Sequence, residues 1–179
     1  MTTPHNILTN DPSFTGWGWA VLNPEGVVLS SGCIKTEPEH KKKRIRVADD
    51  RTRRAAEITR TLLKIIRRDN IGLILSELPH GSQNAQAAVM IGIVAGITTA
   101  IAEGLNIPIE YYSEQDAKKA VLGKKAATKS DMVYQIMLLY PSKWYNHIKY
   151  HDEAVADALA IHYVATQQSQ MLKMMKKKN

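Results

Sequence analysis

The sequence predicts an α/β fold in which a mixed sheet, an antiparallel hairpin plus parallel strands, carries helices on both faces. Strand-like alternation fills the first part of the chain, and helical patterns alternate with short apolar runs after it. At 179 residues the chain suits one domain with a hydrophobic core and is short for two. We expect a single domain over residues 1–170 and a basic, flexible tail over 171–179.

The opening of the chain predicts an antiparallel arrangement. Residues 6–11 form a short apolar strand, and residues 15–22 place alternate apolar side chains on one face. Residues 23–26 read Asn-Pro-Glu-Gly, with proline and glycine where a type I turn favours them. Residues 27–34 then return as a hairpin partner.

The middle of the chain alternates helices and strands. Residues 48–69 carry an apolar stripe of helical period, and residues 71–76 form a wholly apolar strand buried on both faces. A helix of small residues follows over 85–102, with Gly104 as its C-cap. Residues 107–112 form another strand.

Capping patterns place the remaining helices. Ser113 and Thr128 each precede an aspartate at capping-box spacing and therefore begin helices. The second of these covers 129–140 and ends at Pro141, and the last helix begins near His151.

Charge and cysteine content narrow the class of protein. Lys and Arg number 24 against 17 acids, which gives a net charge of +7 and a pI near 9.5. This balance suits a polyanionic partner, nucleic acid first and an anionic membrane surface second. Cys33 is the sole cysteine, so no internal disulfide and no cysteine-based zinc site can form. The amino terminus has no signal-peptide pattern, and we expect a cytoplasmic location.

Residues 85–102 are nearly uncharged over about the length of a membrane span, and Gly92 and Gly96 form a GxxxG pair. The segment is rich in small residues, contains Thr98 and Thr99 and has no aromatic belt. We therefore predict a helix buried on most sides within protein, with glycines that allow close approach of a neighbour, and no membrane insertion.

Three acids stand where folding alone does not favour them. Asp11 ends the first strand, Glu77 follows the apolar strand, and Asp157 lies in an apolar helical stretch. An ionised carboxylate in such a place is costly unless a cation compensates it. Carboxylates with phosphate oxygens and water are the ligands that Mg²⁺ accepts. Asp11 before Pro12 could instead start a turn, and Glu77 before Leu78 could be a solvated strand end, whereas Asp157 fits a purely structural interpretation least well.

Five segments, in order, resemble RuvC-type Holliday junction resolvases of the RNase H-like superfamily. NILTNDPSFTGWGWAVL with SSGCIKT resembles the family's opening, and LILSEL its apolar strand ending in Glu. IGIVAG resembles its glycine-bearing interface helix, DAKKAVLG and ATKSDMV its lysine segments, and ADALAI its C-terminal helix. The resemblance runs from about residue 6 to 165. In its compact size, basic arm and divergent last motif, the chain is more similar to the phage-encoded branch of the family than to the cellular branch.

The resemblance implies that Asp11, Glu77 and Asp157 are catalytic carboxylates holding two Mg²⁺ ions, with Mn²⁺ as a substitute. The family places a fourth ligand at the position of Ala154, where this sequence departs from the pattern. Glu153 lies only about 40° from Asp157 around a helix, and we expect it to be the fourth ligand.

Asp152 lies about 140° from Asp157 on the same helix. With His151 it is a lesser candidate for the fourth ligand. His147 and His151 have spacing that could bind a metal, but no further ligand motif accompanies them.

The resemblance also implies DNA contacts. Lys118 and Lys129 match lysines that contact DNA phosphates or assist at the scissile bond, and their simpler interpretation is solvated helix lysines. His80 falls where relatives carry an aromatic that stacks on bases. A basic run adds phosphate contacts that position DNA without reading sequence, and affinity should fall steeply with salt. The run comprises Lys41, Lys42, Lys43, Arg44 and Arg46, followed by Arg51, Arg53 and Arg54.

The leading hypothesis is a homodimeric endonuclease, joined through the 85–103 helix, that cuts four-way DNA in paired nicks and leaves 5′-phosphate and 3′-hydroxyl ends. A two-fold dimer presents identical centres to a two-fold substrate. Two alternatives remain: a broader branched-DNA or flap nuclease, and a noncatalytic junction-binding relative. A phage-encoded enzyme would act in the bacterial cytoplasm or nucleoid.

Overall fold

The computed structural model describes residues 5–39, 45–123 and 128–177. The strands are β1 (Asn6–Asp11), β2 (Gly16–Leu22), β3 (Val28–Lys35), β4 (Ile71–Glu77) and β5 (Ile109–Tyr112). The helices are α1 (Val47–Arg68), α2 (Ala85–Leu105), α3 (Glu114–Leu122), α4 (Lys129–Leu139), α5 (Lys149–Gln168) and α6 (Gln170–Lys177).

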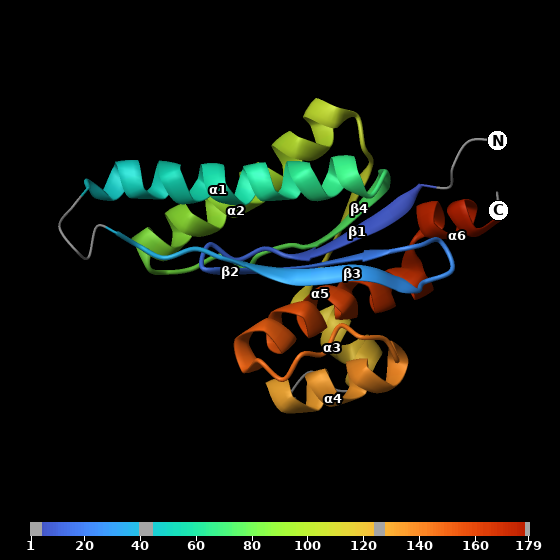
Figure 1. Ribbon diagram of the computed structural model, residues 1–179. Coiled ribbons are helices and arrows are strands. Elements are labelled where there is room, and N and C mark those ends of the chain that lie inside the picture. Colours follow the sequence, from blue (N-terminus) through green and yellow to red (C-terminus); the bar gives the residue numbers. More distant parts are fainter. Residues whose placement is uncertain (1–4, 40–44, 124–127, 178–179) are drawn as a thin grey trace.

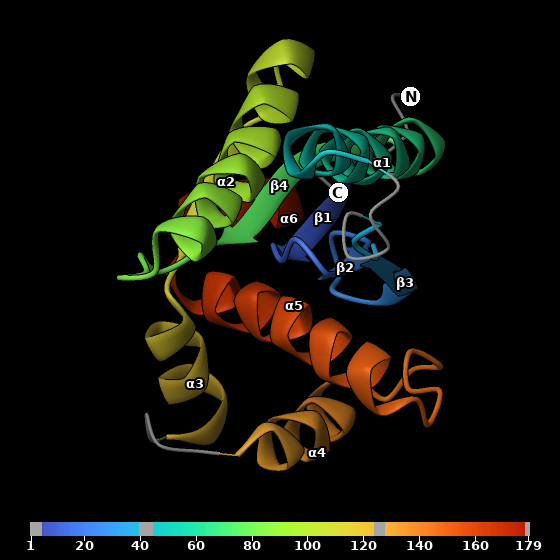
Figure 2. The same cartoon turned by 90° about the vertical axis from the view of Figure 1, so that its left-hand side faces the viewer.

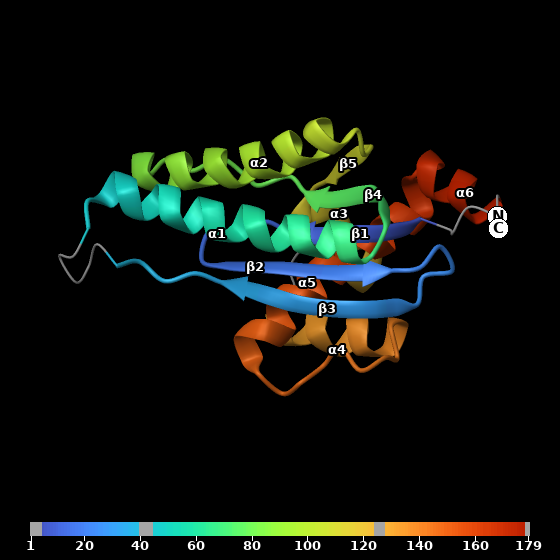
Figure 3. The ribbon, with the colours of Figure 1, turned by 45° about the horizontal axis from the view of Figure 1, so that its top comes forward.

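The strands form one five-stranded sheet in the order β3-β2-β1-β4-β5. β1 pairs antiparallel with β2 and parallel with β4, and β4 pairs parallel with β5 (Figure 3). The hairpin follows from the turn at Asn23, whose backbone carbonyl accepts a hydrogen bond from Gly26. The predicted fold class, a mixed sheet with a hairpin and parallel strands, is confirmed.

Helices cover both faces of the sheet, as Figures 1 and 2 show: α1 and α2 lie on one face, and α5 lies on the other with α3 and α4 outside it. The alternation of side chains along β1 sends Leu8 to the α1 side and Ile7 to the α5 side. The core is therefore two apolar layers separated by the sheet, and every central strand is buried on both faces.

The capping prediction at Thr128 is confirmed. The Thr128 side chain accepts a hydrogen bond from the backbone of Asp131, and the Asp131 side chain accepts one from the backbone of Thr128. At Ser113 the hydroxyl likewise accepts from the backbone of Asp116 and begins α3. These two local signals fix where α3 and α4 start.

Two expectations for α2 were wrong. The helix passes through Gly104 and ends at Asn106, which adopts a left-handed conformation with φ of 54°. We also expected burial on most sides, but only Val94, Thr98, Ile101 and Ala102 are buried. The helix packs mainly against α1, so one long face remains exposed.

Part of the segment predicted as a flexible tail over 171–179 is helical in the described residues, and its flexibility stays a prediction. Residues up to Lys177 form α6, and Leu172 is buried against the α5-side core. The Leu172 amide is bonded to the Ser169 hydroxyl, which links α6 to the end of α5. Leu172, together with the partly buried Met175, therefore packs this helix against the domain.

Candidate active site

The ends of β1 and β4 bring Asp11 and Glu77 side by side. In the parallel register of these strands Asn10 is opposite Ser76, so the next residues on both strands are the two acids. Side chains alternate along a strand, and Leu75, two residues before Glu77, faces α5. Both carboxylates therefore lie at one end of the sheet, on the side that α5 covers.

Helix α5 brings the third acid to the same place because it approaches the sheet closely. The Thr9 hydroxyl donates a hydrogen bond of 2.6 Å to the carbonyl of Ala158. At Gly18, opposite Asp11 in the sheet, an added Cβ would lie 2.0 Å from the carbonyl oxygen of Ala154. Small residues on both sides of this contact let Asp157 reach the strand ends.

Burial and mutual repulsion raise the pKa of all three carboxyls. The pKa of Asp11 is raised well above its usual value by burial first, then by Glu77 and Asp157. Burial, followed by the charges of Glu114 and Asp157, raises the pKa of Glu77 to about 7. The pKa of Asp157 rises to about 6 through burial, although Lys129 opposes the shift. The site is thus a negatively charged cluster that a bound cation would stabilise.

Lys129 supplies a positive charge at the edge of this cluster. Its Nζ lies 3.7 Å from Glu153 Oε2 and 3.9 Å from Asp157 Oδ2. Oxygen donors of this type suit a hard divalent ion. Within the part of the chain that the structure describes, however, no three His, Cys, Asp or Glu side chains are arranged to hold an ion as they stand. The donor chemistry fits a divalent metal, while the side chains are not drawn together around one point.

Among the fourth-ligand candidates, Glu153 faces the cluster and Asp152 does not. The Asp157 pKa is raised in part by the Glu153 charge. Asp152 is buried, and its Oδ1 accepts a hydrogen bond from the Asn146 amide and contacts His151 Nδ1 at 3.3 Å. Asp152 therefore anchors the loop before α5 rather than facing the acids.

Sequence reasoning missed Glu114. Its charge raises the pKa of Asp11, Glu77 and Asp157, and its carboxylate forms an ion pair with Lys118, one turn further along α3. A signal was available, because Glu114 closely follows β5, the parallel neighbour of β4, and parallel strands end at the same edge. Lys118 in turn lies near enough for the charges of Glu77 and Asp157 to raise its pKa, after the larger effect of Glu114.

The other residues that we predicted to contact DNA lie at separate places along the chain. His80 is exposed, three positions past Glu77. Arg46 is exposed but forms two hydrogen bonds with Asp49. Lys41, Lys42, Lys43 and Arg44 lie outside the described residues.

Two arginines of the predicted basic run have internal partners. Arg54 is buried, where it donates to the Thr36 hydroxyl and the Phe14 carbonyl. Arg53 pairs with Asp50 and Glu57. Because Arg54 is buried with these partners, it cannot lie on a DNA-tracking surface, whereas a DNA contact by the partly exposed Arg53 stays a prediction.

The sheet, the helices on both faces and the acids at adjacent strand ends place this protein in the RNase H-like class of α/β domains. Residues 7–164 match the family described as "Crossover junction endodeoxyribonuclease RuvC". The chain therefore belongs to the RuvC family.

Individual relatives agree with this assignment. The RuvC of Shewanella piezotolerans is 30% identical over 136 residues, which cover 74% of this chain and 73% of the relative. The RuvC of Sodalis glossinidius is 27% identical over the same shares of both chains. Among solved structures, Thermus thermophilus RuvC in complex with a Holliday junction substrate superposes with a TM-score of 0.73 at 20% identity, over 93% of this chain and 96% of that one. The yeast mitochondrial Holliday junction resolvase Ydc2 gives 0.62 at 14% identity, over 98% and 83%.

Proposed function

We propose that this protein is a metal-dependent endonuclease that resolves four-way DNA junctions by paired nicks, leaving 5′-phosphate and 3′-hydroxyl ends. The observation that carries the proposal is the convergence of Asp11, Glu77 and Asp157 at one end of the sheet in a member of the RuvC family. We place its action in the bacterial cytoplasm or nucleoid, where such DNA is found.

We infer that Asp11, Glu77, Asp157 and Glu153 hold Mg²⁺, with Mn²⁺ able to replace it. Two bound ions would lower the pKa of an attacking water and stabilise the leaving oxygen of the phosphodiester. Support comes from the raised carboxyl pKa values, since a cluster that is unfavourable without a cation gains most from binding one.

The two site lysines have different environments and, in this proposal, different roles. Lys129 has a side chain 67% exposed and only long contacts with Glu153 and Asp157, so it is free to turn toward a phosphate. Lys118 is more buried and is held by Glu114. We propose that Lys129 neutralises the DNA phosphate at the site. Lys118 would provide a fixed positive charge beside Glu77.

We further propose a homodimer formed through residues 85–103. By length and composition alone α2 could cross a membrane, and one such helix is weak evidence; most of its surface is exposed in this structure. Its exposed face carries Val89, Gly92 and Gly96, and a Cβ at either glycine would meet nothing within 4 Å in this chain. A second copy of α2 would cover that face and place two identical sites about a two-fold axis.

The test is cleavage of a fixed four-way junction with Mg²⁺, compared with a flap, a fork and a linear duplex, with Asp11→Asn as the control. Symmetrical nicks confined to the junction support the proposal. Equal cutting of flaps and forks would indicate the broader nuclease. Junction binding without cleavage in either Mg²⁺ or Mn²⁺ would indicate a noncatalytic relative, for which Ala154 is the favouring observation.

A further inference from the structure

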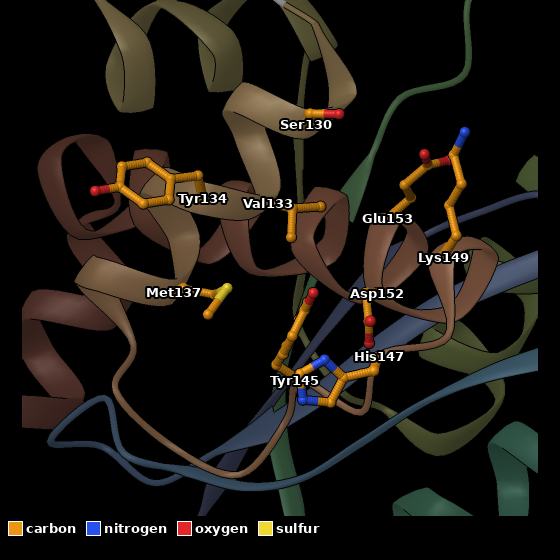
Figure 4. A pocket seen from close by; sticks show the side chains of 9 residues that line it. All are labelled: Ser130, Val133, Tyr134, Met137, Tyr145, His147, Lys149, Asp152 and Glu153. Atoms are coloured by element: carbon orange, nitrogen blue, oxygen red, sulfur yellow. The ribbon is translucent and has the colours of Figure 1, made fainter.

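A groove with a cavity volume of about 480 Å³ lies between α4 and the start of α5. Figure 4 shows the side chains that line it: one helix face of α4 forms one wall, and the segment before α5 forms the other. The α4 wall carries Ser130, Val133, Tyr134 and Met137, and the opposite wall carries Tyr145 and His147.

The groove is continuous with the acidic cluster. Glu153 lines its end, and the same carboxylate lies 3.7 Å from Lys129 Nζ, which is 3.9 Å from Asp157. Lys129 itself immediately precedes Ser130, the first groove residue on α4. From Ser130 to Met137 the helix rises about 10 Å. A strand whose phosphate lies at the acids therefore has the groove directly beside it.

Contacts within the protein hold the wall opposite α4 in place. The rings of Tyr145 and His147 meet edge to face, with centroids 4.6 Å apart. His147 has a φ of 66°, an uncommon conformation for this residue, and the backbone is held there by neighbouring bonds. Asp152 accepts from the Asn146 amide, and the Asn146 side chain accepts from the Ile148 amide, each at 3.0 Å.

We propose that this groove binds one unpaired nucleotide of the DNA strand, next to the phosphate at the acidic cluster. Aromatic and imidazole rings stack on nucleobases without regard to sequence, and Lys149 at the rim supplies a cation for the backbone. The volume lies within the range of small-ligand sites. The inference rests on the proposed function, because the acids bring the strand to the groove.

The mixture of rings and charges favours a nucleotide over an apolar peptide. Polar and charged side chains interrupt the apolar lining, namely those of His147, Lys149, Asp152 and Glu153. The net charge of +7 also favours a polyanion as the incoming molecule.

Photocrosslinking tests this assignment. 5-Iododeoxyuridine is placed in turn at each position around the branch point of a fixed junction, and any cleaved phosphate is mapped separately with the unmutated protein. Asp11→Asn protein, which retains the junction uncut, is irradiated on this DNA and the crosslinked peptide identified. We expect the crosslink at Tyr145 or His147.

Matched variants sharpen the result. Tyr145→Leu and His147→Asn should each reduce the crosslink and weaken junction binding about ten-fold, since stacking on one ring contributes at that level. Asparagine tolerates the left-handed backbone of residue 147, and Tyr145→Phe should restore the signal because it keeps the ring. Tyr150→Leu is the control, because Tyr150 is an exposed tyrosine nearby whose ring lies under Lys35, outside the groove.

Two failures can be told apart. If the unmutated protein cleaves junctions but the crosslink maps elsewhere, or both groove variants crosslink normally, the groove does not bind the nucleotide and the proposed function stands. If the crosslink maps to the groove but no metal supports cleavage, the groove assignment stands and the nuclease function fails. Circular dichroism of each variant separates loss of binding from loss of folding.

Discussion

Helices α5 and α2 have similar lengths and are both rich in alanine, yet the more apolar of the two, α2, is the less buried. Eleven of the 20 residues of α5 are buried, against four of the 21 in α2. α5 lies between the sheet and the pair α3 and α4, whereas α2 lies over α1 at one side of the sheet (Figure 2). The apolar composition of a helix indicates how much of its surface favours burial. The elements that pack against the helix determine how much of that surface is buried within one chain.

The two helices also differ in where they carry charge. α5 carries Glu153 and Asp157 one turn apart beneath the strand ends, while α2 has no charged residue before Glu103. The buried helix therefore holds the candidate chemistry, and the exposed helix presents a neutral surface suited to a second copy. Substitutions in each helix, and at its contacts, test whether the two helices have these separate roles.

The largest effect should come from Asp157→Asn in α5. Cleavage should fall by roughly a thousand-fold or more, as happens when one member of a catalytic unit is removed. Without metal the variant should melt at a higher temperature than the unmutated protein, because it loses a carboxyl whose pKa is raised to about 6. Cleavage rates and melting in EDTA measure both. Cleavage retained within ten-fold would remove Asp157 from the site.

Gly18→Ala tests how closely α5 approaches the sheet. The new Cβ would lie 2.0 Å from the backbone carbonyl of Ala154, and that atom cannot move without displacing the helix. We expect a loss of about 3 kcal/mol in the free energy of unfolding, measured with urea. An unchanged midpoint would mean that α5 does not pack as tightly as the structure has it.

The acidic cluster predicts an unusual pH dependence for the metal-free protein. The pKa of Glu77 rises from 4.5 to about 7, and that of Asp157 from 3.8 to about 6, so the folded state binds more protons than the unfolded state in this window. The free energy of unfolding should therefore decrease by several kcal/mol as pH rises from about 4 to about 7. Urea titrations in EDTA measure this, and saturating Mg²⁺ should reverse the loss. A stability that rises across the window would contradict the cluster.

Gly96→Ala in α2 should have the smallest effect on folding, and the opposite sign to Gly18→Ala. A Cβ there meets nothing within 4 Å, and alanine favours a helix over glycine by about 1 kcal/mol. The monomer should become more stable, while self-association measured by sedimentation should weaken because the close approach of a second α2 is obstructed. Tighter association would argue against an interface at the glycines.

Much of the local structure could be predicted because its causes are local. The capping box at Thr128 involves residues three apart, and the alternation before Asp11 needs only the two faces of a strand. The positions of Asp11 and Glu77 at strand ends follow from the same reasoning. Glu114 was missed because its importance depends on β5 lying beside β4, which no local pattern states.

The burial of Arg54 and of Leu172 could not be predicted from the local sequence either. Both occur in basic segments whose composition predicts solvent exposure, and both are buried by partners distant in the sequence. Local composition gives the average behaviour of a segment, and a single long-range contact overrides it for one residue.

The order and type of the elements up to α5, the capped helix starts and the identity of the unusual acids could all be predicted from the chain, since each depends on neighbours within a few positions. Long-range contacts, by contrast, enclose α5 and leave α2 exposed, bring Glu114 beside the acids and place an aromatic groove next to them. Those outcomes depend on which surfaces meet after the chain folds, and the free energy of each contact belongs to pairs of residues that the sequence keeps far apart.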